Sequence, residues 1–233
     1  MVRHVVLHIG PHKTASTSFQ FSLNANINEL RAQGFCVYHP LNNGINAAEV
    51  AAAAKSHSES SSQVKSNLSA QIEQSQCHTL LLSAEPLWRI QSESEVSALK
   101  SLFDNVDVKI TILFVNRRFQ EWEASYRRML GDKEFRAVAQ ADGFCIFSKQ
   151  SFKDLLSFYE GHFDEVLVVD FESEKLIRDL YVALGVHPEQ LRLKFHHNSR
   201  SLKKFPLSLL INMYSKYLAR GPFGKLKRSI FNE

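Results

Sequence analysis

A lysine followed by small hydroxylated residues comes directly after an apolar run near the start of the chain. The run is Val-Val-Leu-His-Ile over residues 5–9, and the segment after it reads Gly10, Pro11, His12, Lys13, Thr14, Ala15, Ser16, Thr17. The run has the length and β-branched content of a buried strand, the Gly-Pro step ends it, and helical character begins at Thr14. A strand that turns directly into a helix brings backbone N–H groups, the helix dipole and here a lysine ammonium to one point. The pattern therefore predicts a cradle for a phosphate or sulfate group, with an ordinary strand–turn–helix connection as the alternative.

This loop is shorter than the Walker type, Gly-x4-Gly-Lys-Ser/Thr, which wraps around the phosphates of ATP and GTP. Only Pro11 and His12 separate Gly10 from Lys13, and no glycine directly precedes the lysine. The spacing favours a single terminal phosphate or sulfate and disfavours a kinase or GTPase loop.

Two further polar clusters follow apolar runs that predict strands. Ser83-Ala84-Glu85-Pro86 ends the run over residues 79–83, and Asn116-Arg117-Arg118 ends the run over residues 108–115. Parallel sheets bind ligands at the carboxyl ends of their strands, so we expect both clusters to converge on the lysine loop.

Arg117 and Ser125 are eight residues apart, and together they suit a second phosphate. A guanidinium offers a planar fork of donors, and a hydroxyl on the following helix adds one more hydrogen bond. The alternative for the arginine pair is a helix-surface charge or an ion pair with Glu121 or Glu123.

Strand and helix patterns alternate along the chain, which predicts an α/β fold with a mostly parallel, doubly wound sheet and helices on both faces. The apolar residues Phe19, Leu23, Ile27 and Leu30 recur at helical spacing, so we expect one amphipathic helix that ends at Gly34. The chain of 233 residues, 44% of them apolar, is long enough for one such domain over residues 1–190. Residues 191–233 are expected to form a helical, basic extension.

Charge and cysteine content suggest the surroundings of the protein. The last 40 residues carry nine Lys and Arg and one acidic residue, whereas the first 193 have a net charge of −4. This asymmetry favours a polyanionic ligand or an acidic membrane surface, and a solvated basic tail is the alternative. The three cysteines are widely spaced, so we expect reduced thiols and no metal site. No signal peptide or membrane-spanning run is recognisable, and we expect a cytoplasmic protein.

The segment Gly-Pro-His-Lys-Thr-Ala-Ser-Thr resembles the 5′-phosphosulfate loop of the sulfotransferase superfamily, whose usual form is Pro-Lys-x-Gly-Thr-Thr. It is closer to bacterial relatives in which His-Lys-Thr-Gly-Thr-Thr follows Gly-Pro. The spacing from Arg117 to Ser125 matches the Arg and Ser that bind the 3′-phosphate in the same superfamily. The resemblance covers about residues 4–200 and favours the bacterial or glycan-type branch on a fold like that of the P-loop NTPases.

The resemblance implies transfer of a sulfuryl group from 3′-phosphoadenosine 5′-phosphosulfate to an acceptor hydroxyl or amine, without a metal. The 5′ end of this co-substrate would then be held by the loop residues Gly10, Pro11, His12, Lys13, Thr14, Ala15, Ser16 and Thr17. Arg117 and Ser125 would hold its 3′-phosphate. Lys13 would also stabilise the charge that develops on the bridging oxygen as the sulfur–oxygen bond breaks.

Glu85 is the first candidate for the base that removes the acceptor's proton, because it follows a strand beside the anion loop. It resembles the Glu after the corresponding strand in glycan-modifying sulfotransferases, and a Glu that caps the next helix is the alternative. His12 lies within the loop and is a second candidate. His8 is expected to be a core histidine with its hydrogen bonds satisfied.

Two residues of the anion loop depart from the family pattern. Ala15 takes the usual place of glycine and Ser16 that of threonine. If the turn requires a positive φ at residue 15, alanine strains it by about 1 kcal/mol.

Three hypotheses follow. The first is a sulfotransferase acting on a saccharide or another hydroxylated acceptor, with Arg127, Arg128, Lys133 and Arg136 as candidates for an acidic-glycan groove. The second is a nucleotide-kinase type of phosphotransferase, for which Asp170 is the candidate Mg²⁺ ligand. The third is a non-catalytic nucleotide-binding protein. We expect no nucleic-acid partner, and peripheral membrane contact through the basic Lys225, Lys227 and Arg228 is a further hypothesis. The sequence leaves the acceptor and the oligomeric state open.

Overall fold

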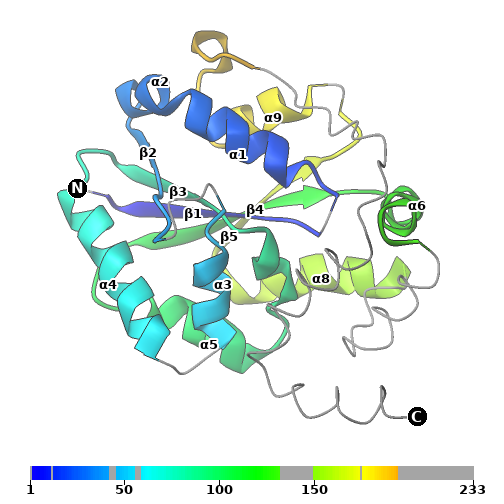
Figure 1. Ribbon diagram of the computed structural model, residues 1–233, viewed down its shortest axis with the longest axis horizontal. Coiled ribbons are helices and arrows are strands. Elements are labelled where there is room, and N and C mark those ends of the chain that lie inside the picture. The colour runs from blue at the N-terminus through cyan, green and yellow to red at the C-terminus, as the bar shows by residue number, and fades with distance from the viewer. Residues whose placement is uncertain are drawn as a thin grey trace. The chain divides into compact units, whose positions relative to one another are not determined.

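The computed structural model describes residues 2–11, 13–41, 46–55, 59–131, 149–173 and 175–193. Within them, five parallel strands form one sheet in the order β2-β3-β1-β4-β5 (Figure 1). The strands are β1 (His4–Ile9), β2 (Phe35–Val37), β3 (Thr79–Ser83), β4 (Lys109–Asn116) and β5 (Glu165–Asp170). The predicted parallel, doubly wound α/β sheet is therefore confirmed.

Helices cover both faces of this sheet (Figure 1). One face carries α1 (Ser16–Ala25), α2 (Ile27–Ala32) and α9 (Leu176–Ala183). The other carries α3 (Ala48–Lys55), α4 (Glu59–Gln74), α5 (Glu93–Ser101), α6 (Phe119–Leu130) and α8 (Lys149–His162). Strand residues alternate between the two layers: Val5, Leu7 and Ile9 pack on the α3–α8 side, and Val6 packs on the α1–α9 side. The continuous apolar strands are explained by this burial on both faces.

The central strands of the sheet are β3, β1 and β4. From β1 the chain first adds β2 and β3 on one side of this strand, and then adds β4 and β5 on its other side. In such sheets the crevice for ligands opens at the carboxyl ends of the strands that flank this change of sides. The register aligns His8 with both Ser83 and Leu113. The three polar clusters predicted from the sequence thus follow three adjacent strands.

The expected single helix up to Gly34 is wrong, because the chain forms α1 and α2 with a break at Asn26. The side-chain amide of Asn26 hydrogen-bonds to the backbone: its nitrogen donates to the Ser22 carbonyl at 2.7 Å, and its oxygen accepts from the Arg192 backbone N–H at 2.7 Å. Side-chain hydrogen bonds of this kind compete with the backbone hydrogen bonds of a helix. The spacing of apolar residues in the sequence gives no sign of this competition.

Cys36 and Cys77 form a disulfide, with their Cα atoms 5.8 Å apart. The expectation of reduced thiols is therefore wrong for this pair. Disulfides are rare in cytosolic proteins, so the pairing removes the argument from cysteines for a cytoplasmic location. Cys145 lies outside the described residues. Among the helices that the structure describes, none is long and apolar enough to cross a membrane.

The sheet's amino-terminal end carries a histidine–hydroxyl pair of its own. His4 Nε2 lies 2.6 Å from Thr111 Oγ1, and this hydroxyl donates to Glu165 at 2.7 Å. The pair belongs to β1 and β4, at the opposite end of the sheet from the three polar clusters.

Candidate functional site

The loop between β1 and α1 is closed on itself by a side chain. Thr14 Oγ1 donates a hydrogen bond to the Pro11 carbonyl at 2.7 Å, and Thr14 is fully buried. A Cβ on Gly10 would lie 2.5 Å from this hydroxyl oxygen, so only glycine allows the close approach. The Thr14 hydroxyl proton is used inside the loop, so it is not available to a ligand in this arrangement.

Two loop residues have the left-handed backbone conformation that side chains disfavour. The φ angle is 69° at Lys13 and 60° at Ala15, and α1 begins at the next residue, Ser16. The sequence left open whether the turn requires a positive φ at Ala15, and the structure shows that it does; the positive φ at Lys13 was not considered. Each costs about 1–2 kcal/mol relative to glycine, so the fold maintains this loop shape against local strain.

Arg117 reaches the lysine loop from the neighbouring strand. It lies between β4 and α6, and its guanidinium donates a hydrogen bond to the Lys13 carbonyl. The ring of Phe171 stacks on the guanidinium, with its centroid 4.0 Å from Cζ. Arg117 Nε is buried and has no hydrogen-bond partner in the described part of the chain. The hydrogen bond and the stacked ring thus hold the guanidinium in place.

Lys13, Glu85 and Arg117 interact electrostatically. Burial lowers the pKa of Lys13, the Glu85 carboxylate raises it, and the Arg117 charge lowers it. Burial also lowers the pKa of Arg117, which still remains a cation at any ordinary pH. Glu85 is the first residue of the 3₁₀ helix η1 (Glu85–Arg89), two residues beyond β3, and it is half-buried. The structure therefore brings together a lysine, an arginine and a carboxylate from three adjacent strands.

The remaining hydroxyls differ in their surroundings. Ser16 is buried, and its Oγ has no hydrogen-bond partner among the described residues. Thr17 in α1 and Ser125 in α6 are half-buried. His12 lies outside the described residues, as do Lys133, Arg136 and the basic segment from residue 194 onward.

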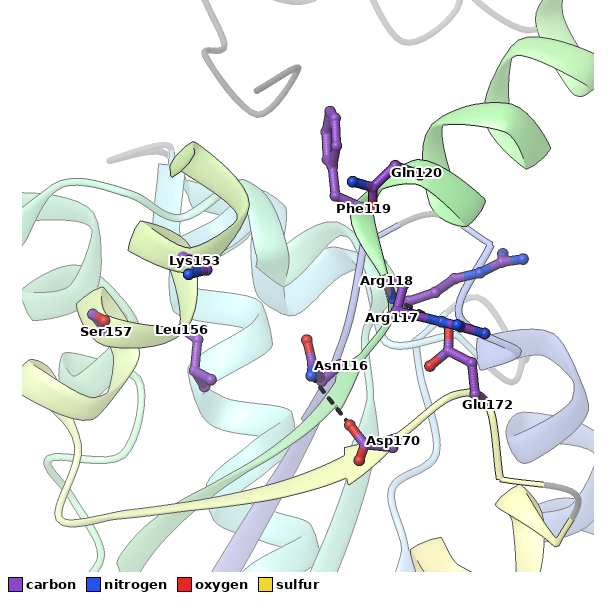
Figure 2. Close-up of a pocket in the computed structure, with 10 residues that line it drawn as sticks. All are labelled: Asn116, Arg117, Arg118, Phe119, Gln120, Lys153, Leu156, Ser157, Asp170 and Glu172. Carbon is purple, nitrogen blue, oxygen red and sulfur yellow. Dashed lines mark hydrogen bonds and ion pairs between the residues drawn. The ribbon is translucent and has the colours of Figure 1, made fainter. Parts of the chain in front are cut away.

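An open groove of about 770 Å³ starts at Arg117 and extends toward α8 (Figure 2). Ten of the described residues line it: Asn116, Arg117, Arg118, Phe119, Gln120, Lys153, Leu156, Ser157, Asp170 and Glu172. Ser125 is not among them. The size suits a nucleoside or a comparable small molecule. Lys153 and Ser157 of α8 were missed by the sequence analysis, because nothing in their local pattern separates them from a solvated helix face.

Of the two arginines, Arg118 forms the close ion pairs that the structure describes, whereas Glu121 and Glu172 act on Arg117 only through their charge, which raises its pKa against the lowering by burial. The Arg118 guanidinium lies 2.6 Å from Glu121 and 3.5 Å from Glu172, and its backbone N–H donates to Glu172 at 3.1 Å. Although burial opposes it, the backbone hydrogen bond and the positive charge of Arg118 hold the pKa of Glu172 below its usual value. Arg127 is likewise paired with Glu123 within α6 at 2.8 Å, which leaves it a weaker candidate for an acidic-glycan groove.

Asp170 ends β5 and accepts a hydrogen bond from Asn116 Nδ2 at 3.1 Å (Figure 2). Within the described ranges, no group of three or more His, Cys, Asp and Glu side chains is placed to hold a metal ion.

The chain matches no protein-family model and no curated protein. The solved structures that are similar to this chain include three that match over nearly their whole length. The tunicamycin resistance protein of Deinococcus radiodurans is 11% identical, with 79% of this chain and 97% of that chain covered and a TM-score of 0.46. A sugar kinase from Janibacter sp. HTCC2649 is 13% identical, with 82% of this chain and 99% of that chain covered and a TM-score of 0.40. A fungal RNA kinase is 10% identical, with 95% of this chain and 100% of that chain covered and a TM-score of 0.41. Similarities this remote do not indicate which reaction this chain carries out.

Proposed function

We propose that this protein is a sulfotransferase that takes its sulfuryl group from 3′-phosphoadenosine 5′-phosphosulfate. The observation that carries the proposal is the joining of Lys13 and Arg117 across two adjacent strands, β1 and β4. This donor carries an anionic group at the 3′ and at the 5′ position of its ribose. It therefore needs two cationic binding sites close together, here at the carboxyl ends of the strands. The loop around Lys13 would hold the 5′-phosphosulfate, and Arg117 with Ser125 would hold the 3′-phosphate.

The chemistry asks little beyond position and charge. An acceptor oxygen attacks the sulfur, the sulfur–oxygen bond to the 5′-phosphate breaks, and the electron pair passes to the phosphate oxygen. The Lys13 ammonium stabilises the charge that develops there, and Glu85 takes the acceptor's proton. Glu85 supports this role because its carboxylate lies near enough to Lys13 to raise the pKa of the ammonium.

A phosphotransferase is the second candidate, and Asp170 is the residue that favours it. A carboxylate at the end of β5, beside Asn116, stands where an acidic strand end could help to hold Mg²⁺ and a nucleotide. The short lysine loop favours the sulfotransferase, because it lacks the second glycine and the length that wrap around a β-phosphate.

The test compares the two donors directly. Purified protein is incubated with labelled 3′-phosphoadenosine 5′-phosphosulfate and a panel of neutral, amino and acidic saccharides, and in parallel with labelled ATP, Mg²⁺ and the same panel. The proposal expects label from the sulfate donor alone, lost in Lys13→Ala and retained in Arg31→Ala, a change of an exposed arginine on α2. Transfer from ATP alone would establish the second candidate instead.

A further inference from the structure

A chain of buried hydrogen bonds lies under the proposed site. His8 Nδ1 lies 2.8 Å from Ser83 Oγ, and Gln20 Nε2 donates to the same hydroxyl oxygen at 3.1 Å and to the Ser83 carbonyl at 3.4 Å. The three side chains are 2%, 4% and 5% exposed, and the ring of Phe19 packs against that of His8 with their centroids 4.7 Å apart. Replacing both partners of a buried hydrogen bond by apolar groups of the same shape can be nearly neutral or stabilising, so stability alone does not require this trio.

Each member of this trio lies close in sequence to a different part of the site. His8 comes two residues before Gly10, where the lysine loop begins. Ser83 comes two residues before Glu85. Gln20 lies one helical turn after Ser16, on the same face of α1. The Ala84 backbone N–H also donates to the His8 carbonyl at 3.1 Å, so the strand pairing continues up to the residue before Glu85.

We propose that His8, Ser83 and Gln20 are positioning residues that hold Glu85 in place relative to Lys13 and the anion loop. The inference rests on the proposed function, in which Glu85 takes the acceptor's proton. Hydrogen bonds have direction and length, whereas apolar contacts tolerate sliding, so this trio defines the geometry of three elements at once. Proton transfer depends on such geometry, and a displacement of about 1 Å lowers a rate roughly 100-fold.

His8 contributes geometry rather than a proton. Complete burial lowers its pKa to about 3, so the imidazole is neutral wherever the protein is folded at ordinary pH. His8 Nδ1 and Ser83 Oγ share one hydrogen bond, and the tautomer of the neutral ring decides which of the two donates. Nε2 has no hydrogen-bond partner among the described residues, so the bond to Ser83 determines the position of the ring.

The experiment removes one hydroxyl and compares it with a matched hydroxyl elsewhere. Ser83→Ala deletes the hydroxyl that both His8 and Gln20 contact, and Ser83→Thr restores one. Gln20→Met removes the amide at nearly constant size. Thr111→Val is the control, because it deletes another buried strand hydroxyl that pairs with a histidine, at the opposite end of the sheet.

Two readouts are taken on variants shown by urea unfolding to be folded. The first is kcat for sulfuryl transfer beside the Kd for 3′-phosphoadenosine 5′-phosphate. We expect Ser83→Ala and Gln20→Met to lower kcat about 10- to 100-fold with the Kd changed less than about 2-fold, and Ser83→Thr to recover most of the loss. We expect Thr111→Val to leave kcat unchanged. Wild-type kcat in folded Ser83→Ala and Gln20→Met, or an equal loss in Thr111→Val, would overturn the inference.

The second readout needs no turnover. The lysines are ¹³C-dimethylated, the Lys13 signal is identified by its loss in Lys13→Ala, and its pH titration is followed by NMR. If Ser83→Ala lets Glu85 move away, the pKa of Lys13 falls toward its value in Glu85→Gln, whereas Thr111→Val leaves it unchanged. An unchanged Lys13 titration in Ser83→Ala would overturn the inference. If the wild-type protein transfers no sulfuryl group, the proposed function fails, and this titration alone decides the positioning role.

Discussion

Glu85 and Arg117 flank Lys13 from the two strands that neighbour β1, and they change the pKa of Lys13 in opposite directions. Burial is the largest influence and lowers the pKa, so the lysine loses its proton at a lower pH than a solvated lysine does. A neutral lysine holds an anion poorly. Burial of Lys13, together with the smaller influences of Glu85 and Arg117, therefore determines the pH above which an anionic donor is lost.

Replacing Glu85 by Gln removes the influence that raises the pKa of Lys13. We expect the alkaline loss of affinity for 3′-phosphoadenosine 5′-phosphate to move to lower pH in Glu85→Gln, because Lys13 is then neutral at a lower pH. Calorimetric titrations from pH 7 to pH 10 measure this, with Glu93→Gln, an exposed carboxylate in α5, as the matched control. The same pH dependence in Glu85→Gln and in the wild type would show that Glu85 and Lys13 do not interact.

Ala15 has a backbone conformation that glycine adopts without strain, with φ at 60°. We expect Ala15→Gly to raise the free energy of unfolding by about 1 kcal/mol, since glycine pays no penalty from a Cβ there. Ala70→Gly, inside α4, provides the control and should lower the same quantity by about 1 kcal/mol. Urea unfolding measures both, and destabilisation by Ala15→Gly would argue against a left-handed residue 15.

Gly10→Ala places a methyl group 2.5 Å from Thr14 Oγ1. Because the threonine is fully buried and bonded to the Pro11 carbonyl, it cannot move aside cheaply. We expect a loss of about 1–3 kcal/mol of stability. In a Thr14→Ala background the same change should cost clearly less, and additive losses in this double-mutant cycle would contradict the close approach.

The Cys36–Cys77 disulfide closes a loop with a sequence separation of 41 residues, which contains α3 and α4. Loop-closure entropy of this size corresponds to about 4 kcal/mol of stability. We expect reduction of the wild type, and the double change Cys36→Ala with Cys77→Ala, to lower the free energy of unfolding by similar amounts. A wild type whose unfolding is the same with and without reductant would show that the bond does not form.

His8 makes the fold sensitive to acid. Its pKa is about 3 in the folded state, below the ordinary 6.5, so the unfolded chain takes up a proton first as the pH falls. The contribution of His8 to stability is complete above about pH 6.5 and declines by about 1.4 kcal/mol per pH unit below it. Between pH 7 and pH 5 we expect the wild type to lose about 2 kcal/mol more than His8→Gln. An equal loss in both would show that His8 is not buried in its neutral form.

The sequence was sufficient to predict the central strands and the polar clusters that follow them. Strand length, β-branched content and the Gly-Pro step are local features. Because parallel sheets bind ligands at the carboxyl ends of their strands, these features also predict that Lys13, Glu85 and Arg117 lie close together there. A positive φ at residue 15 could be considered from the sequence, because alanine stands where the sulfotransferase loop that this segment resembles has glycine.

Contacts that arise only from the packing of distant elements could not be predicted from the sequence. Phe171 stacks on Arg117 only because β5 lies beside β4, and nothing near residue 171 indicates that contact. Lys153 and Ser157 line the groove through the placement of α8. The cysteines are 41 residues apart and meet only after β2 pairs with β3. His8 was expected to have both ring nitrogens satisfied, but only Nδ1 has a partner among the described residues.

The most direct test of the account asks whether Arg117 recognises the 3′-phosphate while Lys13 recognises the 5′ end. The Kd values of 3′-phosphoadenosine 5′-phosphate and of adenosine 5′-phosphate are measured by calorimetry on the wild type, Arg117→Gln and Lys13→Ala. We predict that the wild type prefers the doubly phosphorylated nucleotide and that Arg117→Gln abolishes this preference, a loss of about 10- to 100-fold for that ligand alone. Lys13→Ala should weaken both nucleotides by a similar factor. A preference for the 3′-phosphate that survives in Arg117→Gln would contradict the account.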